Sequence, residues 1–124
     1  MMTPLLSVAL GGAIGASLRY LSGQALVRLM GTGFPWGSFA VNIVGSFAMG
    51  LAFIILSQQA PKLSPFLVVG VLGGFTTFSA FSLEAVTLYD RGQAGLAAVY
   101  VIGSVVLSIA ALIAGIALAR SILS

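Results

Sequence analysis

Cysteine and histidine are both absent from the 124 residues of this sequence. Their absence excludes disulfides, thiolate nucleophiles, zinc sites built from thiolate or imidazole, and acid–base catalysis by imidazole. Acidic residues are nearly absent as well, since Asp and Glu together number 2. Most hydrolase mechanisms are excluded together with cysteine and histidine.

Charge is scarce throughout the chain. Charged residues make up 6% of it, and the 5 basic residues are scattered, so the net charge of +3 comes without a dense basic run. A protein that binds nucleic acid needs clustered cations to follow the phosphates. We therefore expect no nucleic-acid partner.

Apolar residues dominate what is present. They account for 60% of the chain, more than a soluble domain of this size can bury, so lipid is the expected solvent. A spanning helix takes about 20 apolar residues, and four such segments occupy residues 4–30, 34–56, 65–89 and 94–123. We predict one all-α domain over residues 1–124, multi-pass in the cell membrane. No removable signal peptide is expected, because the first segment lacks a basic start and a clear cleavage signal.

Basic residues do not favour one orientation in the membrane. With four spans, Lys62 and Arg120 lie on one side and Arg28 and Arg91 on the other. The count that normally orients a membrane protein is therefore tied. Two interpretations stay open: the chain inserts both ways up and pairs as an antiparallel dimer, or its lipids or first helix orient it.

Small residues mark one face of the first segment. Gly11, Gly15 and Arg19 recur every four residues, and glycines at this spacing usually let a second helix approach closely. Arg19 is more informative, because a guanidinium within a membrane segment is costly. It either faces a partner, a wet cavity or an interface, or it extends to the lipid headgroups.

Two polar stripes run along otherwise apolar segments. Both repeat every four residues, and they consist of Ser38, Asn42, Ser46 and Gly50 in the second segment and Tyr100, Ser104 and Ser108 in the fourth. An asparagine in hydrocarbon needs a hydrogen-bond partner, so it either joins helices or turns its amide N–H toward an anion. The serines either bond to carbonyls of their own helix or line a wet track.

The third segment contains the pattern that most disfavours a regular helix. Gly73-Gly74 is followed by Thr76-Thr77, and glycines with β-branched residues weaken a helix. We predict a break in mid-membrane, where the freed backbone must be buried or line a cavity and its carbonyls can bind a cation. Phenylalanines at positions 75, 78 and 81 either pack in a core or offer electropositive ring edges to a small anion.

These motifs together resemble the CrcB/Fluc family of fluoride channels over nearly the whole chain. The resemblance is carried by Gly11-Gly12-x-x-Gly15-x-x-x-Arg19-Tyr20, by Val41-Asn42-x-x-Gly45-Ser46-Phe47, by Gly73-Gly74-Phe75-Thr76-Thr77-Phe78-Ser79-Ala80-Phe81-Ser82, and by the Tyr100, Ser104, Ser108 ladder. It implies a fluoride-selective channel that lowers cytoplasmic fluoride by passive export across the cell (inner) membrane and excludes chloride. It also implies an antiparallel, dual-topology homodimer with two pores and a structural sodium ion at the dimer interface, without an organic cofactor.

The resemblance also implies roles for individual residues. Phe78 and Phe81 become the fluoride-facing rings, with the Asn42 amide beside them. The other implied pathway residues are Thr77, Ser79, Tyr100, Ser104 and Ser108; Arg19 and Glu84 belong to the pore vestibule; and the backbone carbonyls of Gly73 and Thr76 bind the sodium ion. Phe75 is expected to pack, since the family often has Leu there, and Ala80 replaces a common Thr, which removes one hydroxyl.

Two other functions compete with the channel. A small dual-topology multidrug exporter fits the length and charge balance, but it needs a membrane-embedded carboxylate, and only Glu84, late in the third segment, is available. A structural subunit of a larger complex would use the glycine faces but would not explain both polar stripes and a broken helix. The sequence favours the channel, and we therefore expect a protein that is not an enzyme.

Overall fold

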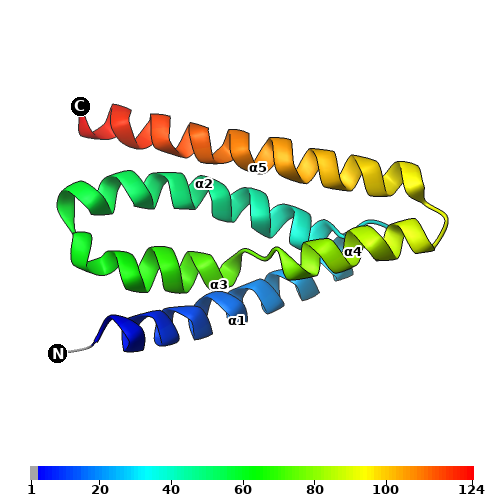
Figure 1. Cartoon of the computed structure of the whole chain (residues 1–124), viewed down its shortest axis with the longest axis horizontal. Coiled ribbons are helices and arrows are strands. Elements are labelled where there is room, and N and C mark those ends of the chain that lie inside the picture. The colour runs from blue at the N-terminus through cyan, green and yellow to red at the C-terminus, as the bar shows by residue number, and fades with distance from the viewer. Residues whose placement is uncertain (1–2) are drawn as a thin grey trace.

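The fold is an all-helical bundle, and the computed structural model describes residues 3–124 of it. The long segments run alternately up and down, and both ends of the chain lie at the same end of the bundle (Figure 1). In chain order the elements are α1 (Pro4–Met30), α2 (Trp36–Gln59), the 3₁₀ turn η1 (Pro61–Leu63), the π-helical η2 (Pro65–Leu72), α3 (Gly73–Phe75), α4 (Ser79–Asp90) and α5 (Ala94–Leu123).

Four segments are long and apolar enough to cross a membrane, namely Pro4–Met30, Trp36–Gln59, Pro61–Asp90 and Ala94–Leu123. The predicted all-α architecture with four spanning helices is thereby confirmed. The first and last helices have the predicted bounds, whereas the second was predicted over residues 34–56 and lies over Trp36–Gln59. It starts later because Phe34 and Pro35 belong to the preceding turn.

The ends of α1 follow from local chemistry. Thr3 Oγ1 accepts a hydrogen bond from the Leu6 N–H at 3.2 Å, and Pro4 occupies the first helical position, where its missing N–H costs nothing. Gly31 ends the helix with a φ of 81°, a left-handed conformation that favours glycine. The turn therefore forms where the sequence changes from apolar residues to glycine and proline.

The third segment is interrupted at residues 76–78, between α3 and α4 (Figure 1). Thr76 is extended, with φ −82° and ψ 160°, whereas Gly73 is still helical. The sequence pattern predicted a weak point at the glycines, and the chain leaves the helix just after them. The interruption lies near the centre of the bundle, where α2 and α1 both reach it.

Glycines allow the helices to cross at backbone distance. A Cβ atom added to Gly15 would overlap the Val71 carbonyl of η2, and one added to Gly11 would overlap the Phe66 carbonyl. The same holds between α2 and α5, where Gly50 and Gly115 each lie against backbone of the opposite helix. The packing interpretation of the Gly11 and Gly15 face is therefore confirmed.

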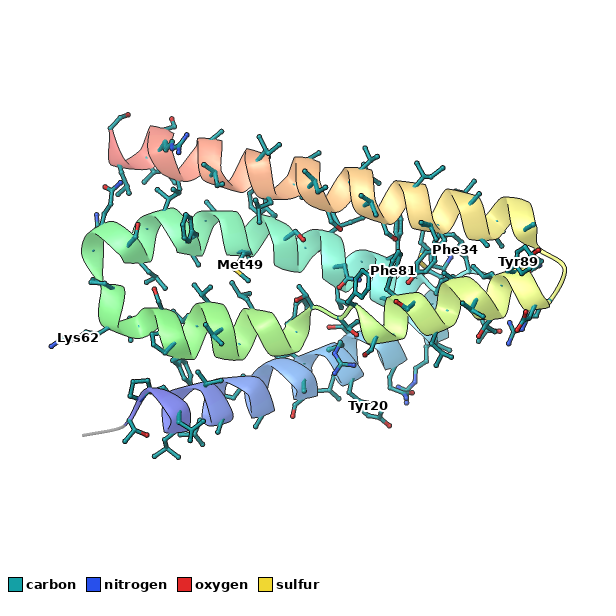
Figure 2. All side chains as sticks on the ribbon, viewed as in Figure 1. Tyr20, Phe34, Met49, Lys62, Phe81 and Tyr89 are labelled. Atoms are coloured by element: carbon teal, nitrogen blue, oxygen red, sulfur yellow. The ribbon has the colours of Figure 1, made fainter. Side chains whose placement is uncertain are left out.

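The basic residues are divided between the two ends of the bundle. Lys62 lies in η1 and Arg120 in the last turn of α5, at the end that also holds the chain termini, and Lys62 points outward there (Figure 2). Arg28 lies in the last turn of α1 and Arg91 follows α4, at the opposite end. The topology thus reproduces the predicted distribution of charge.

Candidate functional site

A cavity of about 250 Å³ lies beside the interruption of the third helix. We call it the central cavity, and it is lined by Asn42, Ser46, Thr76, Thr77, Phe78, Phe81, Ser104, Val105 and Ser108. It collects residues from α2, the interruption, α4 and α5. Asn42 and Ser46 of one predicted polar stripe therefore face the same space as Ser104 and Ser108 of the other.

Asn42 is bonded to the backbone of the interruption. Its Nδ2 donates to the Thr77 carbonyl at 3.0 Å, and its Oδ1 accepts from the Thr77 N–H at 2.8 Å. The asparagine therefore joins α2 to the third segment, as one of its two predicted interpretations required. An amide carries two N–H donors, so these bonds use one of the two.

Two serine hydroxyls in the wall of the central cavity have no partner. Ser104 Oγ and Ser108 Oγ are both buried and make no hydrogen bond among the described residues 3–124. Ser104 is 4% exposed. Buried polar groups are nearly always paired, so these hydroxyls point to a ligand or water in the cavity.

The two phenylalanines of the central cavity differ in exposure. Phe78 is 78% exposed, whereas Phe81 is 9% exposed. Their ring centroids lie 5.6 Å apart with planes at 46°. Phe81 points from α4 into the bundle (Figure 2). The Phe78 side chain lines the cavity with one side and leaves its other side exposed at the surface of the chain.

Tyr100 packs against one residue that lines the central cavity and is bonded to Glu84, which lines a second cavity described below. Its ring lies 5.2 Å from the Phe81 ring, and its hydroxyl donates to Glu84 Oε1 at 3.1 Å. Phe34 meets the tyrosine ring at 90° and 5.4 Å, and Tyr100 is fully buried. The hydroxyl is therefore held in place by packing as well as by Glu84.

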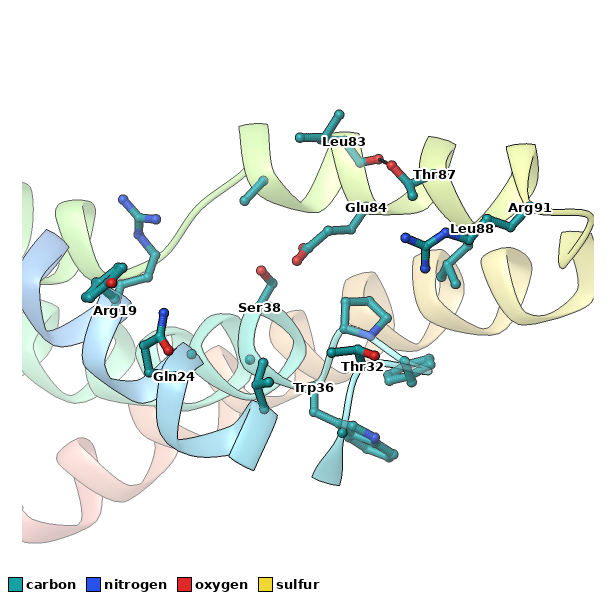
Figure 3. A pocket seen from close by; sticks show the side chains of 18 residues that line it. Arg19, Gln24, Thr32, Trp36, Ser38, Leu83, Glu84, Thr87, Leu88 and Arg91 are labelled. Carbon is teal, nitrogen blue, oxygen red and sulfur yellow. Dashed lines mark hydrogen bonds between the residues drawn. The ribbon is translucent and has the colours of Figure 1, made fainter. Parts of the chain in front are cut away.

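A second cavity, of about 460 Å³, opens at the end of the bundle that carries Arg91. We call it the outer cavity; its polar lining comes from Arg19, Gln24, Thr32, Ser38, Glu84, Thr87 and Arg91. The Glu84 carboxylate points toward Ser38, with Arg19 and Arg91 to either side (Figure 3). Within residues 3–124 none of these charges forms an ion pair. Arg19 and Glu84, predicted at a vestibule, thus lie in one cavity.

Arg19 is bonded to α3, just before the interruption. Its Nε donates to the Gly74 carbonyl at 3.2 Å. The side chain therefore has a protein partner beside the break and lines a cavity. This outcome follows the first of the two interpretations left open by its spacing.

The carbonyls of Gly73 and Thr76 are the metal ligands predicted for this site. Among the described residues no cluster of three or more His, Cys, Asp or Glu side chains is present. The Thr77 N–H bonds to Asn42 and the Ala80 N–H bonds to Thr77 Oγ1 at 3.1 Å. In an uninterrupted helix those two N–H groups would bond to the carbonyls of Gly73 and Thr76, so both predicted sodium ligands lose their helical donors.

Not every predicted pathway residue lies at the central cavity. Ser79 is exposed and lines neither cavity. Tyr100 lines neither cavity either, although its ring packs against Phe81. Residues not predicted for the pathway include Val105 and Ser46, and Ser46 was detectable from its place in the α2 stripe. Phe34 was not detected, because nothing in the sequence places a turn residue against Tyr100.

Comparison with known proteins identifies the family. A family model described as "CrcB-like protein, Camphor Resistance (CrcB)" matches residues 6–116. The chain belongs to the CrcB family. Together with its four apolar helices, membership in the CrcB family makes the chain a multi-pass membrane protein.

Individual CrcB relatives are similar over nearly their full lengths. The chain is 59% identical over 120 residues to the fluoride-specific ion channel FluC of Cereibacter sphaeroides, covering 97% of each chain. It is 54% identical over 118 residues to a protein of that name from Agrobacterium fabrum, covering 93% of this chain and 94% of the relative. The names of these CrcB relatives describe ion channels and not enzymes.

Proposed function

We propose that this chain forms a fluoride-selective channel that lowers cytoplasmic fluoride by passive export across the cell (inner) membrane. Its relatives carry the name of a fluoride-specific ion channel. The observation that carries the proposal is the wall of the central cavity, where the buried hydroxyls of Ser104 and Ser108 have no partner among the described residues.

The central cavity supplies the groups that a small anion requires. Fluoride is tightly hydrated, so a pathway must replace its water with several positive dipoles. The Ser104 and Ser108 hydroxyls, the second N–H of Asn42 and the ring edges of Phe78 and Phe81 supply such dipoles. Since none of these groups is a cation, none would trap the ion.

The chain needs no energy source for this task. Hydrogen fluoride crosses lipid as a neutral acid and ionises inside, where the charged form is trapped by the cost of entering hydrocarbon. An inside-negative potential drives the anion outward with about 2.3 kcal/mol per 100 mV. A proton-coupled exporter would depend on the Glu84 carboxylate. That carboxylate already has a protein partner, because it accepts a hydrogen bond from Tyr100.

The functional unit in this proposal is an antiparallel homodimer. The basic residues are balanced, with Lys62 and Arg120 at one end and Arg28 and Arg91 at the other. Phe78 lines the central cavity but is 78% exposed, so a single chain leaves the wall incomplete. A second copy, inserted the opposite way up, closes that side.

The proposal places a structural sodium ion at the dimer interface. Gly73 and Thr76 fit as ligands, because hard cations prefer oxygen donors and both carbonyls have lost their helical N–H partners. The interruption lies in mid-membrane in this arrangement, since 8 residues of η2 and 3 of α3 precede it and 12 of α4 follow it. When bound, the ion supplies positive charge that holds the freed carbonyls.

Efflux from liposomes tests this function. Vesicles that contain only the purified protein and a potassium fluoride solution are diluted into fluoride-free buffer, and a fluoride electrode follows release after valinomycin allows potassium to leave. We expect rapid fluoride release and little release from matched chloride vesicles. Vesicles that release neither anion, or both equally, would contradict a fluoride-selective channel.

A further inference from the structure

The Arg19 side chain reaches the interruption of the third helix from α1. Its Nε–H donates to the Gly74 carbonyl at 3.2 Å. In a continuous helix that carbonyl would accept from the Phe78 N–H, but Phe78 lies in the non-helical stretch. Arg19 therefore replaces a hydrogen bond that the interruption removes.

This bond falls between the two carbonyls proposed for sodium. Gly74 directly follows Gly73 and lies two positions before Thr76. Successive peptide planes are joined at shared Cα atoms, so the direction of the Gly74 carbonyl constrains its neighbours. Two adjacent glycines would otherwise leave this backbone unusually free to rotate.

The same helix holds Gly74 on a second side. A Cβ atom on Gly74 would lie 2.8 Å from the Gly12 carbonyl of α1, so the two backbones touch here. Two turns of α1 further along, Arg19 donates to the Gly74 oxygen. Helix α1 therefore fixes both the position and the direction of this peptide group.

We infer that Arg19 is a positioning residue which, through the Nε–H bond to Gly74, holds the Gly73 and Thr76 carbonyls in the arrangement that binds sodium. This inference rests on the proposed function. It differs from a role in attracting anions into the outer cavity, because that role depends on the charge of Arg19. The positioning role depends on one N–H donor and not on the charge.

Two substitutions separate these roles. The side-chain nitrogen of glutamine is as many bonds from Cα as Arg Nε, so Arg19→Gln keeps an N–H donor and removes the charge. Arg19→Met has similar length and removes both. The first readout is the melting temperature of the purified protein at increasing sodium concentration, with potassium added to keep the ionic strength constant. The sodium concentration that gives half of the full rise in melting temperature is called the half-point. The sodium dependence of fluoride efflux is the second readout.

We expect Arg19→Met to need about tenfold more sodium in both measurements, the effect of losing one hydrogen bond. Arg19→Gln should stay within about threefold of the wild type. A purely structural role would lower the melting temperature at every sodium concentration without changing the half-point. A purely electrostatic role would shift both variants equally.

The outcomes decide between these accounts. Equal shifts in the two variants, or a wild-type half-point in Arg19→Met, would overturn the inference. If Arg19→Met fails to assemble, Arg19→Gln decides the outcome, because the two variants differ in the N–H donor. A wild-type half-point in Arg19→Gln then supports the inference, and a tenfold shift overturns it. Failure of the proposed function looks different, because the wild-type protein itself would then release no fluoride or show no sodium response.

Discussion

Asn42 bonds to both backbone groups of Thr77, donating through Nδ2 at 3.0 Å and accepting through Oδ1 at 2.8 Å. The amide thus takes the place of the helical partners that Thr77 would have in a continuous helix. The interruption of the third helix is held open from α2 by this pair. The central cavity exists because the chain does not close into a helix at that point.

Replacing Asn42 with leucine should impair both structure and flux. The Thr77 N–H and carbonyl lose their partners, which costs about 2 kcal/mol or more of unfolding free energy, and the pathway loses an N–H donor. We expect fluoride efflux to fall at least about tenfold, measured in liposomes beside a thermal melt. Ser57→Ala is the control, since that hydroxyl bonds to Ile54 of its own helix. Lower stability with undiminished flux would make Asn42 a structural joint only.

The phenylalanine rings should be essential for their edges and not for their bulk. Phe78→Ile and Phe81→Ile keep apolar volume and lose the electropositive ring edge, so each should reduce fluoride flux at least about tenfold in liposomes while the protein still assembles. Phe53→Ile is a matched control, because Phe53 is 57% exposed on α2 and lines neither cavity. Near-normal flux in both variants, with chloride still excluded, would remove the rings from the mechanism.

The unpartnered serines should matter for flux but not for stability. Ser104→Ala and Ser108→Ala break no hydrogen bond among the described residues, so we expect unfolding free energies within about 0.5 kcal/mol of the wild type. Each single change should slow efflux by about threefold, since water or a neighbouring hydroxyl substitutes, and the double change by more. Ser17→Ala serves as the comparison, because Ser17 bonds to Ala13 on its own helix. A double variant with wild-type flux would contradict a pathway here.

The sodium proposal predicts different tolerance at its two backbone ligands. Thr76→Ser keeps the hydroxyl that bonds to the Leu72 carbonyl at 3.0 Å, and it should retain stabilisation by sodium. Gly73→Leu should lose the stabilisation by sodium. A single chain has room for a side chain at position 73, because the atom nearest to an added Cβ is the Val68 carbonyl oxygen at 3.6 Å. Melting curves with and without sodium measure both. Equal tolerance of the two changes would count against a coordinating interruption.

Dual topology predicts that both ends of the bundle appear on both faces of the membrane. Since the chain has no cysteine, Gln58→Cys and Thr32→Cys each provide one labelling site, at opposite ends of the bundle. An impermeant thiol reagent applied to intact cells should label about half of each variant, because half of the chains present either end outside. Labelling of one variant alone would show a single orientation.

Much of the fold could be predicted because long apolar segments in lipid have few alternatives to the helix. The bounds Pro4–Met30 and Ala94–Leu123 follow from such segments and from the glycine and proline turns between them. The glycine faces were also predictable, since spacing alone aligns Gly11 with Gly15. The second helix was less well bounded, because its apolar segment extends into the preceding turn, to which Phe34 and Pro35 belong.

The site could be predicted as a list of residues but not as an arrangement. The sequence by itself determined an apolar chain with four spanning helices, two polar stripes and a weakened third segment, because these depend on composition and on the helical repeat. Only the tertiary structure decided that Thr77 bonds to Asn42, that Gly74 bonds to Arg19 and that Ser79 lies outside both cavities. Those outcomes depend on which freed backbone group meets which side chain across 35 and 55 positions of sequence, a distance over which no local pattern carries information.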